Sequence, residues 1–336
     1  MNVPTWVWLL TLGLTIAVLV VDVFVIGRRP HEPSRKEVTV ALAGYLGAAV
    51  LFGIGVWLIA GHEYGTEFFA GWLTEYSLSV DNLFIFIIIM SRFAVPRDMQ
   101  QEALLIGIVL ALVFRGVFIA LGAAVIAQFT WVFYFFGAFL VYTAVKLAAE
   151  GPEDEDQYQE NRLVRYVRTV LPHVDEYHGG RLWVRRNRKW LFTPMFVVVV
   201  ALGTTDLLFA LDSIPAIFGL TQEPYLVLTA NLFALMGLRQ LYFLLGGLLE
   251  RLVYLSYGLA LLLLFIGVKL VLHALHENEV PFINGGQPVS WAPDIPIVAS
   301  FAVILGILAV TTVLSLWASR RQGVAERDAH TGPRGH

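Results

Sequence analysis

Runs of about 20 apolar residues constrain this chain more than any other feature of its sequence. They lie near 5–27, 39–60, 68–90, 103–127, 129–149, 192–220, 225–249, 252–275 and 295–318. A helix of about 20 residues crosses a hydrocarbon core of about 30 Å. Hydrophobic residues make up 57% of the chain and charged residues 15%, against roughly 45–50% and 25% in soluble proteins. We therefore expect an all-α polytopic membrane protein with about nine transmembrane helices.

The basic residues indicate how such a chain crosses the membrane. Lys and Arg are concentrated in every second connection: after the first run, after the third, throughout 151–190, and at the start of the C-terminal tail. The connections between these mostly lack Lys and Arg, and some are acidic. Because basic connections face the cytoplasm, we expect the N-terminus outside and the C-terminus inside a bacterial plasma membrane.

Charged residues inside the runs repeat along the chain. Glu75 and Asp81 lie six residues apart in EYSLSVDN, as do Asp206 and Asp212 in TTDLLFALDS. The next run of each half carries a central arginine, and the run after that contains VKL; the paired residues are Arg115 with Arg239 and Lys146 with Lys269. Each unit has three helices, an odd number, so the second unit crosses the membrane inverted. This pattern predicts an inverted three-plus-three helix core, which is typical of secondary transporters.

The predicted organisation follows from these units. Residues 1–60 form two N-terminal transmembrane helices, 66–150 the first three-helix repeat and 191–276 the second, inverted repeat. Residues 151–190 form a cytoplasmic loop with an amphipathic helix that suits the anionic inner leaflet. Residues 277–318 supply an outer loop and the ninth transmembrane helix, and the polar tail 319–336 is expected to be disordered.

The buried charges are the candidate functional site. Each would cost about 2.5–3.5 kcal/mol facing lipid alone, so they should face inward and be paired or solvated. Four carboxylates against two guanidiniums leave an excess negative charge that a divalent cation would neutralise, and protonation would also remove it. The expected metal ligands are Asp81, Asp212, Glu75, Asp206 and Asn82, with Ser79 and Ser213 as possible additional ligands and Arg115 and Arg239 as charge-balancing residues. The alternative is that the Arg–carboxylate pairs only staple helices together.

Helix geometry adds an expectation about the backbone. Residues six apart lie about 9 Å apart along a regular helix and about 120° apart around it. Both carboxylates of one unit can reach a shared site only if the helix is interrupted between them. Ser79, Asn82 and Pro215 are residues that disturb helical hydrogen bonding, so we expect two discontinuous helices. Such all-oxygen sites suit hard ions, for example Mn²⁺, Mg²⁺ or Ca²⁺.

Several functions lack support in the sequence. The chain has no Cys, so disulfide, thiolate-metal and thiol redox sites are excluded. It has no phosphate-binding GxxxxGK[ST] motif and no nucleophile–base pair, so we expect no enzyme and no resident cofactor. The expected partners are a divalent metal ion and the lipid bilayer, and not nucleic acid. No sequence feature identifies a protein partner.

The segments LTEYSLSVDNLFIF, FYFFGAFLVYTAVKL, TDLLFALDSIPAIFGLT and NLFALMGLRQLYFLLGG resemble the TerC family of bacterial integral membrane proteins, which includes Alx and is similar to LysE-type transporters. The resemblance covers nearly the whole chain. It implies manganese export and, for some members, tellurium resistance. One departure is Gly203, which stands where the family pattern has a Glu.

The function expected from residues and resemblance together is a secondary transporter that exports divalent metal cations, with Mn²⁺ as the transported ion. Two other classes remain open at this point. One is a transporter of another ion, such as H⁺, Ca²⁺ or a tellurium oxyanion. The other is a non-transporting membrane assembly or scaffold protein, in which the buried charges would only hold helices together.

Overall fold

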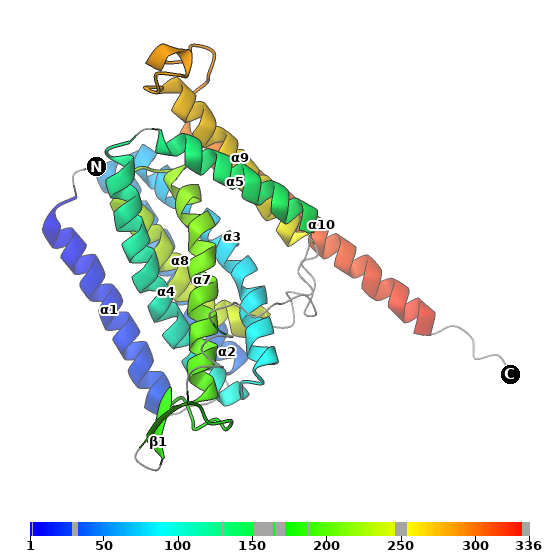
Figure 1. Cartoon of the computed structure of the whole chain (residues 1–336). Helices are drawn as coiled ribbons and strands as arrows, with labels where there is room; N and C mark the ends of the chain where they lie inside the picture. Colours follow the sequence, from blue (N-terminus) through cyan, green and yellow to red (C-terminus); the bar gives the residue numbers. More distant parts are fainter. Residues whose placement is uncertain are drawn as a thin grey trace.

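A computed structural model of the chain is built almost entirely of long helices (Figure 1). It describes residues 1, 3–28, 33–129, 131–150, 164, 172–186, 189–245 and 254–330; the side chains of residues 19, 22–28, 81, 84, 150, 245 and 320–330 lie outside this description. Eight of the described helices are long and apolar enough to span a membrane. The predicted all-α, multi-span class is therefore confirmed.

The N-terminal half contains five helices. They are α1 (Thr5–Arg28), α2 (Arg35–Ala60), α3 (His62–Arg92), α4 (Arg97–Ile126) and α5 (Val132–Glu150). The one predicted span outside these eight is the first, at 5–27, which coincides with α1; the described apolar part of α1 is Thr5–Val18, so its crossing of the membrane stays a prediction. Ser34 and Glu37 form a capping box at the start of α2, which satisfies backbone donors that would otherwise lack a partner.

The C-terminal half begins with a short hairpin that the sequence did not predict. Strands β1 (Trp183–Arg186) and β2 (Lys189–Phe192) pair antiparallel. The predicted amphipathic helix falls mostly on 151–163 and 165–171, outside the described residues. The Tyr177 hydroxyl donates to the Phe93 carbonyl at 2.7 Å, and burial raises the pKa of Tyr177 to about 12. This neutral hydrogen bond ties the segment before the hairpin to the α3–α4 turn.

Four helices and one short turn follow the hairpin: α7 (Pro194–Phe218), α8 (Pro224–Leu245), α9 (Leu255–His276), the 3₁₀ turn η3 (Asn284–Gly286) and α10 (Ile297–His330). The last helix differs from the expected boundary, because it continues to His330 through most of the tail predicted to be disordered. The next proline after the span is Pro333, so no proline interrupts the helix before that point.

Each helix of the first predicted repeat packs mainly against a helix of the second. Helix α3 packs on α8, α4 packs on α7, and α5 packs on α9. Figure 1 shows α5 and α9 side by side, slanted against the bundle of α3, α4, α7 and α8. The first two pairs run parallel, since Gly71 lies against Ala230 and Gly237 against Tyr76, and Gly107 lies against Leu202 and Gly122 against Phe218. A twofold axis relating α3 to α7 and α4 to α8 would pair α3 with α8 and α4 with α7, as observed. The inverted repeat itself stays a prediction.

Helices α5 and α9 approach each other closely through glycine. A Cβ on Gly137 would lie 2.8 Å from the Gly267 carbonyl oxygen, and a Cβ on Gly267 would lie 2.9 Å from the Gly137 carbonyl oxygen. The pair runs antiparallel, because Tyr134 donates to Asn278 at 3.0 Å while Gly267 lies against Leu140. Small residues at such crossings let two helix backbones come together within a membrane.

The prediction of discontinuous helices is wrong. Helix α3 is continuous through Ser79 and Asn82, and α7 is continuous through Pro215. Pro215 lies in the last turn of α7, where loss of one backbone donor disturbs little of the helix. Both helices therefore keep regular geometry, and residues six apart on them point in different directions.

Candidate ion site around Arg115

Four helices meet at the side chain of Arg115. We call the group of Arg115, Glu75, Asp206 and Asn231 the Arg115 centre. Arg115 Nη1 donates to Glu75 Oε2 at 2.7 Å and to Asn231 Oδ1 at 2.8 Å. Its Nη2 and Nε donate to the two carboxylate oxygens of Asp206 at 3.2 and 3.3 Å. The bidentate contact matches the planar fork of a guanidinium. One arginine of α4 thus holds α3, α7 and α8.

The Arg115 centre is sealed from the surface of the protein. Arg115 and Asp206 are each 1% exposed and Glu75 is 0% exposed. Two carboxylates face one guanidinium, so a single negative charge remains uncompensated if all three groups are ionised. A buried ion pair is stable only when further hydrogen bonds satisfy its groups. Asn231 supplies one such bond to the guanidinium, and the excess carboxylate needs a cation or a proton to balance its charge.

Five buried side-chain oxygens on α3 and α7 have no hydrogen-bond partner among the described residues. Two are Thr74 Oγ1 and the Tyr76 hydroxyl, and the three that belong to predicted ligands are Glu75 Oε1, Ser79 Oγ and Ser213 Oγ. Ser79 lies one helical turn beyond Glu75 on α3, and Ser213 lies seven residues beyond Asp206 on α7. Buried polar atoms are nearly always hydrogen-bonded, to protein, water or ligand. Each of these three oxygens can therefore coordinate a cation or accept a hydrogen bond.

The remaining predicted ligands occupy separate positions. Asp212 is partly buried and accepts a hydrogen bond from Thr143 Oγ1 at 3.1 Å, and the charge of Lys146 acts on it. Asn82 is buried in α3. Asp81 lies on α3 beside Asn82, but its side chain is outside the described part of the structure.

Arg239, the second predicted charge-balancing residue, does not join the Arg115 centre. It lies partly buried on α8, eight residues after Asn231. With its amide oxygen turned toward Arg239, the neighbouring Gln240 accepts a hydrogen bond from Nη2 at 3.0 Å.

The structure does not gather Glu75, Asp206 and Asp212, the three predicted carboxylates whose side chains it describes, at one point. Among the residues that are described, no three His, Asp or Glu side chains lie close enough together to hold a metal ion. Because α3 and α7 are continuous, Glu75 and Asp206 meet at Arg115 while Asp212 points toward α5. Any ion path along these residues would have successive positions rather than one closed shell.

Asn231 is the member of the centre that sequence reasoning missed. The signal was an amide within the apolar segment LTANLFALMGL, inside a predicted span. Gly203, where the resembling family has a Glu, is buried on α7. A Cβ at this position would lie 2.3 Å from Leu110 Cδ2. Leu110 thus occupies the space beside Gly203, and its side chain would have to move for a larger residue to stand there.

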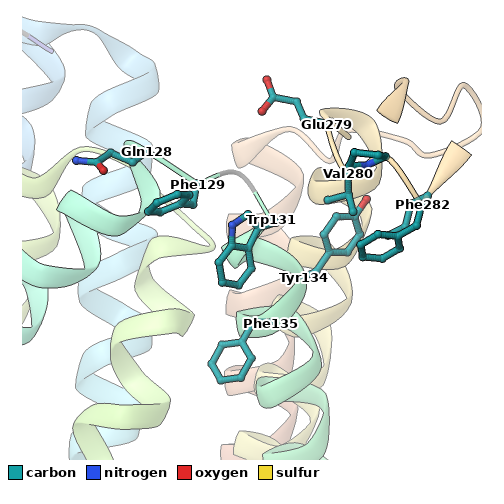
Figure 2. Close-up of a pocket in the computed structure, with 10 residues that line it drawn as sticks. Gln128, Phe129, Trp131, Tyr134, Phe135, Glu279, Val280 and Phe282 are labelled. Atoms are coloured by element: carbon teal, nitrogen blue, oxygen red, sulfur yellow. The ribbon is translucent and has the colours of Figure 1, made fainter. Parts of the chain in front are cut away.

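A pocket of about 780 Å³ lies away from these charges. It opens between the α4–α5 turn and the segment after α9, and Figure 2 shows Phe129, Trp131, Tyr134 and Phe282 along its walls with Glu279 at the rim. Aromatic side chains of this kind gather where a membrane protein meets the membrane–water interface. The apolar lining gives this pocket no set of oxygen ligands for a metal ion.

A family model described as "Integral membrane protein TerC family" matches residues 60–323. An uncharacterized membrane protein of Mycobacterium tuberculosis is 48% identical over 317 residues, covering 94% of this chain and 80% of that protein. A protein of Escherichia coli K12 named "Putative membrane-bound redox modulator Alx" is 36% identical over 312 residues, covering 90% of this chain and 92% of that protein. No solved structure matches the chain.

Proposed function

The chain belongs to the TerC family of integral membrane proteins, and we propose that it is a secondary transporter that exports divalent metal cations, with Mn²⁺ as its transported ion. The observation that carries the proposal is the Arg115 centre. Its two carboxylates outnumber its one guanidinium in a fully buried position. A surplus of negative charge at this depth favours a cation over an anionic or apolar cargo.

The chemistry of the available ligands supports a hard ion. Glu75 Oε1, Ser79 Oγ and Ser213 Oγ are oxygens without a described partner, and Asp81 and Asp212 add carboxylates on the same two helices. Oxygen ligands suit Mg²⁺, Ca²⁺ and Mn²⁺, whereas Cu⁺ prefers thiolates and thioethers. We propose that the ion passes between the Arg115 centre and the Asp81 and Asp212 positions, and that Arg115 prevents permanent occupancy by one ion.

The name of the Escherichia coli relative points to a second function, redox modulation. Thiol–disulfide exchange requires an attacking thiolate, and this chain contains no Cys. A redox effect of this protein would therefore be indirect, through the ion that it transports or through another protein.

The proposed transport is tested by removing the two equivalent aspartates. Asp81→Asn with Asp212→Asn keeps side-chain shape and removes two negative charges. We expect the double variant to lose Mn²⁺ efflux from cells and Mn²⁺-dependent thermal stabilisation of the purified protein together. Asp98→Asn, at an exposed position in the first turn of α4, is the matched control and should keep both. Full Mn²⁺ efflux by the double variant would contradict the proposal that the ion passes the Asp81 and Asp212 positions.

We also propose that the N-terminus lies outside and the C-terminus inside. The absence of native Cys allows single cysteines to be read without background. His62→Cys and Gln287→Cys, both at exposed positions, should react with a membrane-impermeant thiol reagent added to intact cells. Asp98→Cys should react only after the membrane is opened. Labelling of Asp98→Cys in intact cells would reverse the orientation.

A further inference from the structure

Lys269 is a buried basic residue that is not part of the Arg115 centre. It lies on α9 and is 9% exposed. No hydrogen bond or ion pair joins its ammonium to a side chain in the described ranges. An ionisable group inside a spanning helix is costly, and such groups usually have a functional role. Its long, flexible stem lets the ammonium move between partners.

Packing places the C-terminal end of α7 beside Lys269, because Gly219 lies against Leu270 and Gln222 Nε2 lies 3.1 Å from His273 Nε2. Two carboxylates from other elements also act on the charge of Lys269: Asp294, in the segment before α10, and Glu67 on α3. Glu67 is partly buried and accepts a hydrogen bond from Thr221 Oγ1 at 2.6 Å. The charges of Glu63 and Glu223 also act on Glu67. We call Lys269, Glu67, Thr221 and Asp294 the Lys269 cluster.

His273 is the titratable side chain of α9 next to Lys269 on the same face, and His276 follows one turn later. It lies one turn beyond Lys269, with its Nδ1 at 3.7 Å from Asp294 Oδ1 and its Nε2 at 3.4 Å from Glu277 Oε2. Its ring also packs edge-on against Phe133 of α5. Asp294 therefore lies beside His273 and its charge also acts on Lys269, whereas the cation that acts on Glu67 is Lys269.

The cluster lies at one end of the bundle, where α3 begins and α7 and α9 end. Glu67 precedes Glu75 of the Arg115 centre by eight residues on the continuous helix α3, which is about 12 Å along the axis. An ion that leaves the Arg115 centre toward this end passes the level of Glu67. In the proposed orientation this end is the outer one.

We propose that Glu67 and Thr221 form an exit subsite for the transported divalent cation, and that Lys269 is a tethered cation that competes with it there. The inference rests on the proposed function. When no ion is present, the ammonium compensates Glu67. An arriving cation displaces the ammonium, and return of the ammonium expels the cation. Since no three described acids or histidines group as a metal shell here, the subsite holds its ion only in passing.

The competition predicts opposite effects from two neighbouring substitutions. Lys269→Met removes the competing charge and should lower the Mn²⁺ dissociation constant about tenfold. This change is modest beside the Coulomb repulsion between a unit positive charge and a divalent cation near a protein surface. Glu67→Gln should raise that constant, and the double variant should behave as Glu67→Gln does. Lys36→Met, at an exposed position on α2, should leave it unchanged. A merely structural Lys269 would not produce tighter binding.

The measurement is a titration of purified full-length protein with Mn²⁺, followed by the electron paramagnetic resonance signal of the free ion, beside Mn²⁺ flux in proteoliposomes. We expect Lys269→Met to bind more tightly and to transport more slowly, because release is impaired. Equal or weaker binding by Lys269→Met overturns the exit subsite. Wild-type protein that binds Mn²⁺ without transporting it overturns only the proposed function, and wild-type protein that does not bind Mn²⁺ overturns both.

Discussion

Arg115→Met is expected to lower the free energy of unfolding by about 3–5 kcal/mol, the range found when one partner of a buried ion pair is removed. The substitution leaves Glu75 and Asp206 buried, close together and without their guanidinium. It also removes the donor to Asn231. Denaturant unfolding of the purified protein in a mild detergent measures the loss.

A compensated variant separates lost charge balance from lost packing. Arg115→Met combined with Glu75→Gln and Asp206→Asn has no ionised group at the centre, and we expect it to recover most of the stability. Asp206→Asn alone keeps the Glu75 ion pair and should cost less than Arg115→Met. If Arg115→Met unfolds at the same denaturant concentration as wild type, the Arg115 centre does not hold the four helices together.

Gly137→Val should separate α5 from α9. The added Cβ would lie 2.6 Å from Val271 Cγ2 and 2.8 Å from the Gly267 carbonyl oxygen. The second of these contacts is to backbone, which cannot rotate away. Overpacking of this kind costs about 1–3 kcal/mol and occasionally more, and we expect the upper part of that range because the two helices must move as units.

Gly116→Val on α4 is the matched control for this change. A Cβ on Gly116 meets no atom within 4 Å, so the same substitution has no steric cost there. Replacing a helical glycine at such a position removes backbone freedom from the unfolded chain, and the thermal midpoint should stay equal or rise. Equal effects of the two variants would mean that the close α5–α9 approach does not contribute to stability.

The sequence by itself determined the class of the protein and the elements that carry its site. Runs of about 20 apolar residues can cross a bilayer only as helices, and eight helices of suitable length and composition are present. Glu75, Arg115 and Asp206 stood out because charges in apolar helices need partners. The expected helix breaks failed because Ser and Asn tolerate a helix interior and Pro215 lies in its last turn.

Only the tertiary structure decided which of these charges meet. The pattern treated Arg115 and Arg239 as equivalents, yet Arg115 alone receives Glu75, Asp206 and Asn231, which lie 40, 91 and 116 residues away along the chain. Such pairings depend on which helices pack together and at what height, and a helical period fixes only the face on which a residue lies. The packing of α3, α7 and α9 likewise brings Glu67 to Thr221 and the end of α7 to Leu270, next to Lys269, because segments so far apart in the sequence meet only after the bundle has formed.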